Sequence, residues 1–350
     1  MARQNPSYYL NVILLLSYVI FQKSGPNLMK AVDVNLKVIR PGTGDVLPSE
    51  KEYLPRVAVL LCTHHGEAFL AEQLDSIFSQ THKNIVVWAS DDGSTDGTHK
   101  LLEYYQSLLG REKLSIHAGP KEGFVLNFLS LICHSDIEAD YYAFADQDDI
   151  WESDKLCRAI EKLENVPLHQ PALYCSRTRL INDNGAEIGF SPLFKEPPSF
   201  ANSLVQNIGG GNTMVMNKKA INLLRSVGEF TVVSHDWWAY ILVSGSGGKL
   251  FYDSCPTVRY RQHANNLVGS NRSWSSRLFR AEMLMRGRFR DWNSINIEAL
   301  RQANDFLTPE NKRILSQFSA AREAWLLPRL RGIFKSGVYR QTLIGNIGLF

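Results

Sequence analysis

Apolar runs of strand length alternate with helical apolar stripes through the middle of this chain. The strand-like runs cover residues 56–62, 84–90, 114–117 and 141–145, and the stripes cover 70–78, 101–109 and 124–133. Continuous apolar runs are typical of strands that are buried on both faces. Strands that alternate with helices of this length predict right-handed crossovers and a parallel sheet covered by helices. The sequence therefore predicts an α/β fold.

The second half of the chain is less regular. Residues 173–175 and 179–188 have β character around the turn Asn184-Gly185, and a short strand is expected at 213–216. We expect one mixed, mostly parallel α/β domain over residues 55–270. A separate N-terminal extension would cover residues 1–54, and a basic helical tail would cover 271–350.

Composition excludes several classes of protein. Hydrophobic residues make up 44% of the chain and charged residues 21%, which are ordinary values for a globular protein. A net charge of +3 is too small to indicate a nucleic-acid partner. The five cysteines show no paired spacing. They indicate reduced thiols in a cytoplasmic protein and neither a disulfide framework nor a zinc site.

The N-terminal extension contains an apolar run at residues 8–21. A helix that spans a bilayer needs about 20 apolar residues, so this run is short. Three interpretations stay open: a helix that touches a membrane, a helix that docks on the protein, and an upstream extension with Met29 as the true start.

The C-terminal tail is basic. Residues 277–340 hold thirteen Lys and Arg against six Asp and Glu, and residues 325–335 mix bulky apolar with basic side chains. Such a pattern fits a helix lying on the anionic inner face of the cell membrane. It fits equally a packed helical tail with a solvated basic face.

The first acidic cluster, residues 90–98, follows a predicted strand. Its spacing matches a calcium-binding loop with Glu103 at the twelfth position, but a strand and not a helix precedes it. Its Ser, Thr and Asp residues also suit a turn with helix caps. The doubled Asp91-Asp92 at the strand exit suggests a third role, since a carboxylate there can accept a hydrogen bond from a uracil or thymine ring.

The second cluster, Asp146-Gln147-Asp148, also follows a predicted strand. Ligands of open α/β sheets bind at the carboxyl ends of the strands. Two carboxylates there can share a divalent cation with a diphosphate, and Mg²⁺ and Mn²⁺ prefer such oxygen ligands. A solvated loop is the alternative. His263 is a candidate metal ligand, although a lone histidine is more often structural.

The third cluster places Asp236 between His235 and the pair Trp237-Trp238. An acid beside two indoles has an apolar setting that raises its pKa and makes it a better base. The indoles could stack against a sugar ring. Alternatively, Ser234 caps a helix here and both tryptophans belong to the core.

These clusters, with several further motifs, resemble family 2 glycosyltransferases of the GT-A nucleotide-sugar fold, in particular bacterial rhamnosyltransferase-type members. The resemblance runs from about residue 57 to 269. Its motifs are 57–66, 70–81, Asp91-Asp92-Gly93-Ser94-Thr95-Asp96-Gly97-Thr98, Gly123-Phe124 with Asn127-Phe128, 145–151 with Lys155, Gly211-Asn212-Thr213-Met214, His235-Asp236-Trp237-Trp238 and Tyr260-Arg261-Gln262-His263 with Asn266 and Gly269.

The resemblance implies roles for individual residues. The base-binding set would be Thr63, His64, Asp91 and Asp92. Asp146 would face the ribose or sugar, and Asp148 would bind Mn²⁺ or Mg²⁺ with His263. Asp236 would be the general base, and the acceptor side would comprise Gly210, Gly211, Asn212, Trp237 and Trp238. The family usually has Tyr-Asn where this chain has His64-His65, which puts base preference in doubt.

The implied enzyme is an inverting, metal-dependent hexosyltransferase of polysaccharide or O-antigen biosynthesis. The first hypothesis for the donor is dTDP-rhamnose, and a glycan or a lipid-linked precursor at the inner membrane face would be the acceptor. The alternatives are a UDP-hexose donor or a non-catalytic nucleotide-sugar or glycan-binding relative. A nucleotidyltransferase is disfavoured, because the first strand is followed by Thr63-His64-His65-Gly66 and not by a Gly-rich basic loop.

Overall fold

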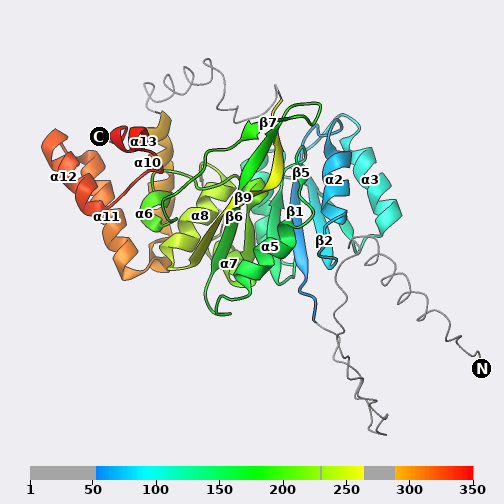
Figure 1. Ribbon diagram of the computed structural model, residues 1–350. Coiled ribbons are helices and arrows are strands. Elements are labelled where there is room, and N and C mark those ends of the chain that lie inside the picture. Colours follow the sequence, from blue (N-terminus) through cyan, green and yellow to red (C-terminus); the bar gives the residue numbers. More distant parts are fainter. Residues whose placement is uncertain (1–52, 229–230, 264–287, 350) are drawn as a thin grey trace, which may run out of the picture. The chain divides into compact units, whose positions relative to one another are not determined.

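A mixed β-sheet forms the centre of the part of the chain that the structure describes (Figure 1). The computed structural model describes residues 53–228, 231–263 and 288–349, which belong to one compact unit. The apolar run at 8–21 and the predicted domain boundary at residue 270 lie outside the described residues.

The described strands form one sheet in the order β3-β2-β1-β4-β8-β6-β9-β5, and β7 pairs with β6. Their bounds are β1 Val57–Thr63, β2 Ile85–Asp91, β3 Leu114–Ala118, β4 Tyr141–Ala145, β5 Ile150–Trp151, β6 Ala172–Ile181, β7 Glu187–Phe190, β8 Val215–Asn217 and β9 Lys249–Arg261. Up to residue 263 the helices are α2 Leu70–Phe78, α3 Thr98–Leu109, α4 Phe124–Cys133, α5 Lys155–Leu163, α6 Phe200–Ser203, α7 Lys218–Val227, α8 His235–Gly245 and the 3-10 helix η1 Gly211–Thr213.

The first half of the sheet is parallel, as predicted. β1 lies between β2 and β4, with Thr63 opposite Asp91 and Leu61 opposite Ala145. The carboxyl ends of the three strands therefore meet at one edge of the sheet. The first two acidic clusters begin at that edge, which is why residues about fifty positions apart can share one site.

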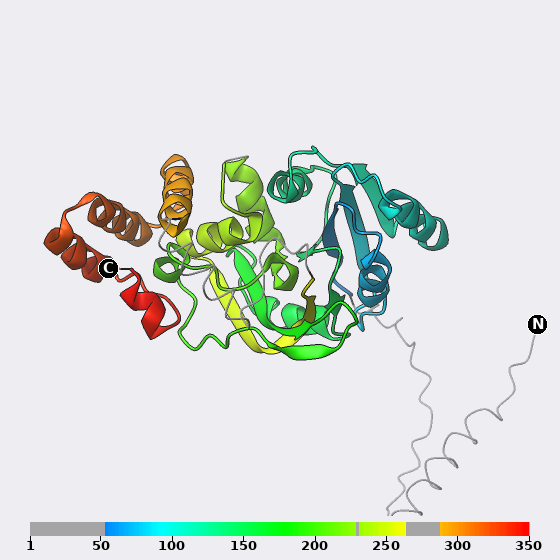
Figure 2. The same cartoon turned by 90° about the horizontal axis from the view of Figure 1, so that it is seen from above.

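Helices cover both faces of the sheet (Figure 2). Along β1, the side chains of Ala58, Leu60 and Cys62 join the core formed with α4, α7 and α8. Those of Val57, Val59 and Leu61 join the core formed with α2, α3 and α5. Every residue of β1 is buried, which explains why its sequence is continuously apolar and does not alternate.

The second half of the sheet mixes directions. β8 runs antiparallel to both β4 and β6, and β6 with β7 forms the predicted hairpin, in which Gly185 has a positive φ of 77°. The long strand β9 pairs in parallel with β6 and was not predicted. Pro256 interrupts its centre, and many of its residues are only partly buried, so the sequence shows no clear period of two.

The C-terminal helices contribute further side chains to the core. They are α10 Arg288–Gln302, η2 Asn304–Phe306, α11 Pro309–Glu323, α12 Leu326–Ser336 and α13 Leu343–Ile347. Leu300 and Phe318 belong to the same core as α8, and the side-chain amide of Asn311 donates to the last carbonyls of α8. No helix among the described residues is long and apolar enough to cross a membrane.

Candidate active site

The ends of β1 and β2 hold the first acidic pair. The buried Asp91 carboxylate accepts hydrogen bonds from the Thr63 hydroxyl at 2.9 Å and from the Ser94 amide at 3.0 Å. The buried Asp92 carboxylate accepts from the amides of Lys121 at 2.6 Å and Gly123 at 2.8 Å. Both acids thus order the loops around the strand ends, which shapes the region where a nucleotide base is predicted to bind.

The His64-His65 segment is tied to the second acidic loop. The side-chain amide of Gln147 donates to the His64 carbonyl at 2.9 Å and its oxygen accepts from the His64 amide at 2.8 Å. A Cβ on Gly66 would lie 2.3 Å from that same oxygen, so only glycine leaves room for this pairing. Both imidazoles remain exposed, which leaves His64 open to a ligand.

Three carboxylates from two distant parts of the chain gather at this sheet edge: Asp146 and Asp148 from one loop, and Asp236 from α8. The pKa of Asp146 is raised to about 7, first by burial and then by the negative charges of Asp148 and Asp236. Burial, followed by the charges of Asp146 and Asp92, also raises the pKa of the Cys62 thiol near the end of β1. The structure therefore brings all three acidic clusters around the end of the central strand.

The two predicted metal ligands lie side by side. Nε2 of His263 is 2.7 Å from Oδ2 of Asp148, and both side chains are partly exposed. His263 lies two residues after the end of β9, and Asp148 lies in the loop after β4. The contact therefore depends on the late strand β9 being paired into the sheet.

The residues present fit a divalent cation. One carboxylate oxygen of Asp148 and one imidazole nitrogen of His263 converge, and the negative charges of Asp148 and Asp236 act, after burial, on the pKa of Asp146. A cation bound beside these acids would neutralise part of that charge. In the described residues, no group of three or more His, Cys, Asp or Glu side chains is placed to hold a metal ion. Substrate oxygens and water would have to complete the shell, as is usual for Mg²⁺ bound with phosphates.

A buried polar network packs against the loop that carries Asp148. Asp149 is fully buried and accepts a short hydrogen bond from the Asn212 side chain, while Nζ of Lys155 donates to the Asn212 carbonyl at 2.7 Å. Burial raises the pKa of Asp149 and lowers that of Lys155, while the negative charges of Asp149 and Asp146 oppose the second shift. Asn212 therefore lies beneath the site, which corrects the expectation that it lines the acceptor side.

Arg261, at the end of β9, joins four segments. Its side chain is 1% exposed and donates to the carbonyls of Asp148 at 3.0 Å and Asp183 at 2.8 Å, and to the carboxylate of Glu72. Its guanidinium also lies 4.4 Å from the Phe69 ring centroid. The sequence suggests no site role for Asp149 and Lys155, and for Arg261 it suggests only a cation, within the basic segment 259–261, that could pair with phosphates. Two features of the sequence could have indicated these residues: the run of acids at 146–149 and the basic segment after residue 258.

Asp236 lies in the first turn of α8. Its Oδ2 accepts from the Asn207 side chain at 2.9 Å and from the Gly211 amide at 3.1 Å, and its Oδ1 accepts from the Trp237 amide at 2.7 Å. A Cβ on Gly211 would lie 2.6 Å from His235, so the backbone can approach the carboxylate only as glycine. These three donors fix the orientation of the Asp236 carboxylate.

The two indoles beside Asp236 are core residues. Trp237 and Trp238 are 5% and 1% exposed, and the Trp237 indole donates to the Ser203 carbonyl at 2.7 Å. Neither ring presents a face to a sugar, which corrects the expectation that they stack against the acceptor. The alternative interpretation is confirmed for the tryptophans, which lie in the core, whereas Ser234 occupies the N-cap position of α8 without a side-chain capping hydrogen bond. Gly210 is exposed and Gly211 is buried.

His235 is a buried imidazole without a hydrogen-bond partner. Its ring stacks on Phe128 at 3.8 Å and meets the edge of Phe144 at 4.8 Å, and neither ring nitrogen has a partner within the described chain. Burial lowers its pKa from 6.5 to about 4. The imidazole is therefore neutral near pH 7.

We expect His235 to make the protein acid-sensitive. The unfolded chain binds a proton at the ordinary pKa of 6.5 and the folded chain only near pH 4. Protonation of the unfolded chain therefore lowers the free energy of unfolding by about 3 kcal/mol as the pH falls from 6.5 toward 4. Above pH 6.5 this loss is absent. Urea unfolding of His235→Leu across this window should show a flatter dependence on pH. The control His169→Leu removes an exposed imidazole and retains the slope; an equally steep slope in His235→Leu would contradict the prediction.

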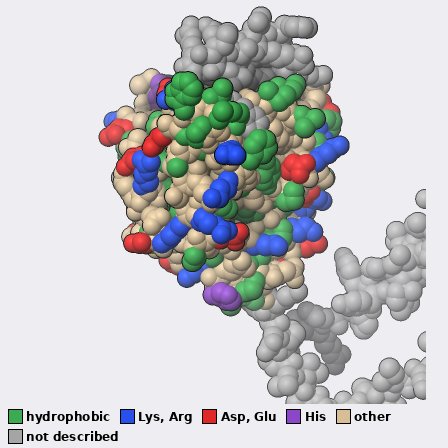
Figure 3. Space-filling model, turned by 90° about the vertical axis from the view of Figure 1, so that its left-hand side faces the viewer, with side chains coloured by type: hydrophobic (Ala, Val, Ile, Leu, Met, Phe, Trp, Pro, Cys, Tyr) green, Lys and Arg blue, Asp and Glu red, His purple; other side chains and the backbone are tan. Residues whose placement is uncertain are grey.

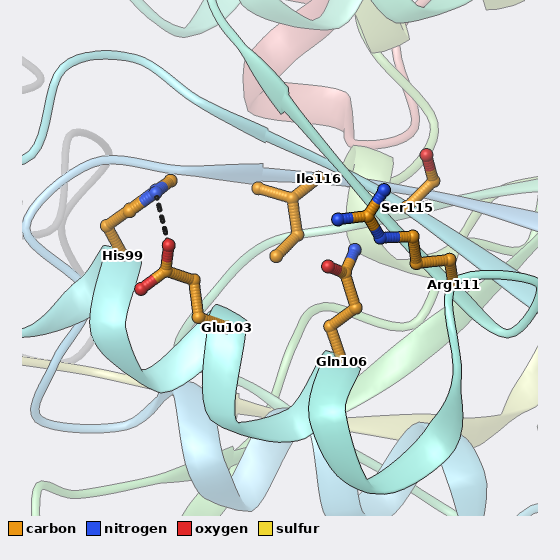
Figure 4. Close-up of a pocket in the computed structure, with 6 residues that line it drawn as sticks. All are labelled: His99, Glu103, Gln106, Arg111, Ser115 and Ile116. Carbon is orange, nitrogen blue, oxygen red and sulfur yellow. Dashed lines mark ion pairs between the residues drawn. The ribbon is translucent and has the colours of Figure 1, made fainter.

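A separate pocket of about 350 Å³ lies between α3 and β3. Figure 4 shows its lining, with the His99 and Glu103 side chains paired at 3.4 Å on the helix. None of the predicted site residues lines it, so this pocket is distinct from the acidic clusters.

The sheet, its covering helices and the acids at the strand ends define a glycosyltransferase of the GT-A class, as the sequence predicted. The chain belongs to glycosyl transferase family 2, since the family's sequence model matches residues 58–235, about half of the chain. The matched segment ends before β9, so it does not include Arg261 or His263.

Individual relatives agree with this assignment. The chain is 30% identical over 228 residues to the dTDP-rhamnosyl transferase RfbG of Shigella flexneri, covering 62% of this chain and 76% of that protein. It is 32% identical over 119 residues to an uncharacterized glycosyltransferase of Haemophilus influenzae, covering 33% and 36%.

Two solved structures are more distantly similar. Staphylococcus aureus TarS in complex with UDP-GlcNAc has a TM-score of 0.48 at 15% identity, covering 81% of this chain and 93% of that one. The mannosyltransferase PcManGT of Pyrobaculum calidifontis, in complex with GDP-Man and Mn²⁺, has a TM-score of 0.46 at 18% identity, covering 84% and 82%. At these scores neither likeness carries information on the site.

Proposed function

We propose that the protein is an inverting glycosyltransferase that requires Mn²⁺ or Mg²⁺ and transfers a sugar from a nucleotide donor to a hydroxyl group of a glycan or lipid-linked acceptor. One observation carries the proposal. The negative charges of Asp148 and Asp236 both act on the Asp146 carboxyl, at the sheet edge where Asp91 and Asp92 also lie. Such a site has acids both for a bound cation and for proton transfer.

The first candidate for the donor is dTDP-rhamnose. The support is the 30% identity to a protein named as a dTDP-rhamnosyl transferase, over 62% of this chain. The acceptor would then be a precursor of a polysaccharide or O-antigen. A UDP-hexose donor is the second candidate, because exposed imidazoles stand where the family usually has Tyr-Asn and can stack on either pyrimidine base.

The proposed mechanism assigns separate tasks to the residues. Thr63, Asp91 and Asp92 shape the base pocket, where the exposed ring of His64 stacks on the base. Asp146 faces the ribose or sugar. Asp148 and His263 would hold the divalent ion, which would supply Lewis-acid neutralisation of charge on the leaving diphosphate.

The proposed chemical step is a direct displacement at the anomeric carbon. Asp236 accepts the proton of the acceptor hydroxyl while the hydroxyl oxygen forms a bond to the anomeric carbon. The bond from the same carbon to the donor diphosphate breaks on the opposite face, so the anomeric configuration inverts. Asn207 and the Gly211 amide hold the carboxylate in place during the transfer.

We place the reaction in the cytoplasm. All five cysteines lie in the described part of the chain and no disulfide forms between them there, which suits a reducing compartment. Measuring activity in separated cytoplasmic and periplasmic fractions would test this, and activity confined to the periplasm would contradict it.

The experiment that tests the function is a donor panel. Hydrolysis and transfer are measured for dTDP-rhamnose and several UDP-hexoses, with Mn²⁺, with Mg²⁺ and with EDTA, on the wild type and on Asp148→Ala. We expect turnover of one donor that needs the metal and falls at least about 100-fold in Asp148→Ala, because the variant loses the carboxylate that holds the ion.

Asp154→Ala, which removes an acid that is more than half exposed at the start of α5, serves as the matched control and should keep full turnover. Metal-independent turnover would contradict the metal role. Nucleotide-sugar binding without turnover, with any acceptor extract, would favour a non-catalytic binding relative. Comparing protection by dTDP and UDP against heat unfolding separates the two donor hypotheses.

A further inference from the structure

The end of the chain exposes an unusual number of large apolar side chains. On α12 and just before it, Trp325, Leu326 and Leu327 are 89%, 60% and 72% exposed, and three further apolar side chains on α13 are more than two-thirds exposed. Figure 3 shows the face that carries these helices, on which hydrophobic and basic side chains lie side by side. Clustered apolar exposure of this kind marks an interaction surface.

The charge of the same segment has one sign. From residue 324 to 350 the sequence contains four arginines and lysines and no acidic residue. On α12, Leu327, Arg331 and Lys335 follow each other at intervals of four, so they lie on one face, and all three are exposed. The opposite face buries Ile333 and Ser336 against the rest of the protein.

We propose that this face of α12, with the apolar side chains before it, docks on an anionic lipid bilayer. Apolar side chains would enter the headgroup region while the basic residues pair with lipid phosphates and carboxylates, as in helices that lie in a membrane interface. A second copy of the chain fits less well, because a symmetric contact would set the same positive charges against each other. The proposal does not rest on the donor or on the chemistry of the acidic site.

The test measures sedimentation of the full chain with phosphatidylcholine vesicles, with and without phosphatidylserine, at low and high salt. We expect binding only with phosphatidylserine, and weaker binding in salt. Arg331→Gln and Lys335→Gln should each lower the partition constant about fivefold, and Leu326→Ser combined with Leu327→Ser should lower it more.

Matched control variants come from elsewhere on the described surface. Leu168, at the turn after α5, is 98% exposed, and Lys100 and Lys162 are exposed lysines of α3 and α5. Leu168→Ser, Lys100→Gln and Lys162→Gln should bind vesicles as the wild type does. Equal losses in the control and α12 variants, or unchanged binding in the α12 variants, would overturn the proposal.

Trp325 reports whether α12 itself enters the lipid. Brominated acyl chains quench indoles that reach the interface, so the wild type should lose more fluorescence than Trp325→Phe on the same vesicles. Equal quenching in both proteins would place the contact elsewhere. A dimer detected by light scattering that Leu327→Ser dissociates, without vesicle binding by the wild type, would assign the surface to a second copy and overturn the membrane proposal.

Discussion

Replacing Asp236 with Asn is expected to lower kcat for sugar transfer by about 10²–10⁴-fold. The amide cannot take the acceptor proton, although it keeps the size of the carboxylate. Donor binding should change little, because the residues predicted to hold the nucleotide lie on β1, β2 and the loop after β4. The measurement is steady-state transfer at saturating donor, together with calorimetric titration of the donor.

The same substitution needs a control for local disturbance. Asn207→Ala removes one donor to Asp236 and leaves its carboxylate, so we expect a smaller fall in kcat that is partly restored at higher pH. If Asp236→Asn retains wild-type kcat with an intact donor affinity, another residue takes the proton and the proposed base is wrong.

Replacing Arg261 with Leu is expected to cost about 3–5 kcal/mol of unfolding free energy. The buried guanidinium donates to the carbonyls of Asp148 and Asp183, and a leucine would leave these acceptors without their donor. The loop that carries Asp148 would then lose a support. We therefore also expect weaker Mn²⁺ binding, measured by titration of the folded variant in parallel with urea unfolding.

Arg259 provides the matched control for this experiment. It lies two residues earlier on β9, is 45% exposed and pairs with Glu152 at 3.0 Å. Arg259→Leu should cost less than about 1 kcal/mol, as expected for an exposed ion pair. An equal loss of unfolding free energy in the two variants would show that the buried contacts of Arg261 stabilise the fold no more than an exposed ion pair does.

The sequence predicted the first half of the fold well, because local signals and packing agree there. β1, β2 and β4 are buried on both faces and read as continuous apolar runs, and α4 matches its predicted range of 124–133. β9 was missed because partial burial and Pro256 obscure its period. Its partner β6 lies far away in the sequence, and pairing partners are not encoded locally.

The sequence predicted the acidic residues of the candidate site, but it predicted poorly which residues surround them. A short sequence window shows that Asp146 and Asp148 follow a strand, but not that Arg261 reaches back to them. Trp237 and Trp238 were assigned to the acceptor because an acid beside two indoles suggests a sugar site. Their burial follows from the direction of α8, which turns both rings into the core, and neighbouring residues alone do not reveal that direction.

The contact between His263 and Asp148 spans 115 residues, and that between Arg261 and Glu72 spans 189. Loops of such length close slowly when a chain folds, because much conformational entropy is lost before the contacts form. During synthesis the domain can collapse around β1 long before β9 has left the ribosome. The site would therefore be completed as one of the last events of folding, and a nascent chain would remain inactive until nearly the whole catalytic domain has been made.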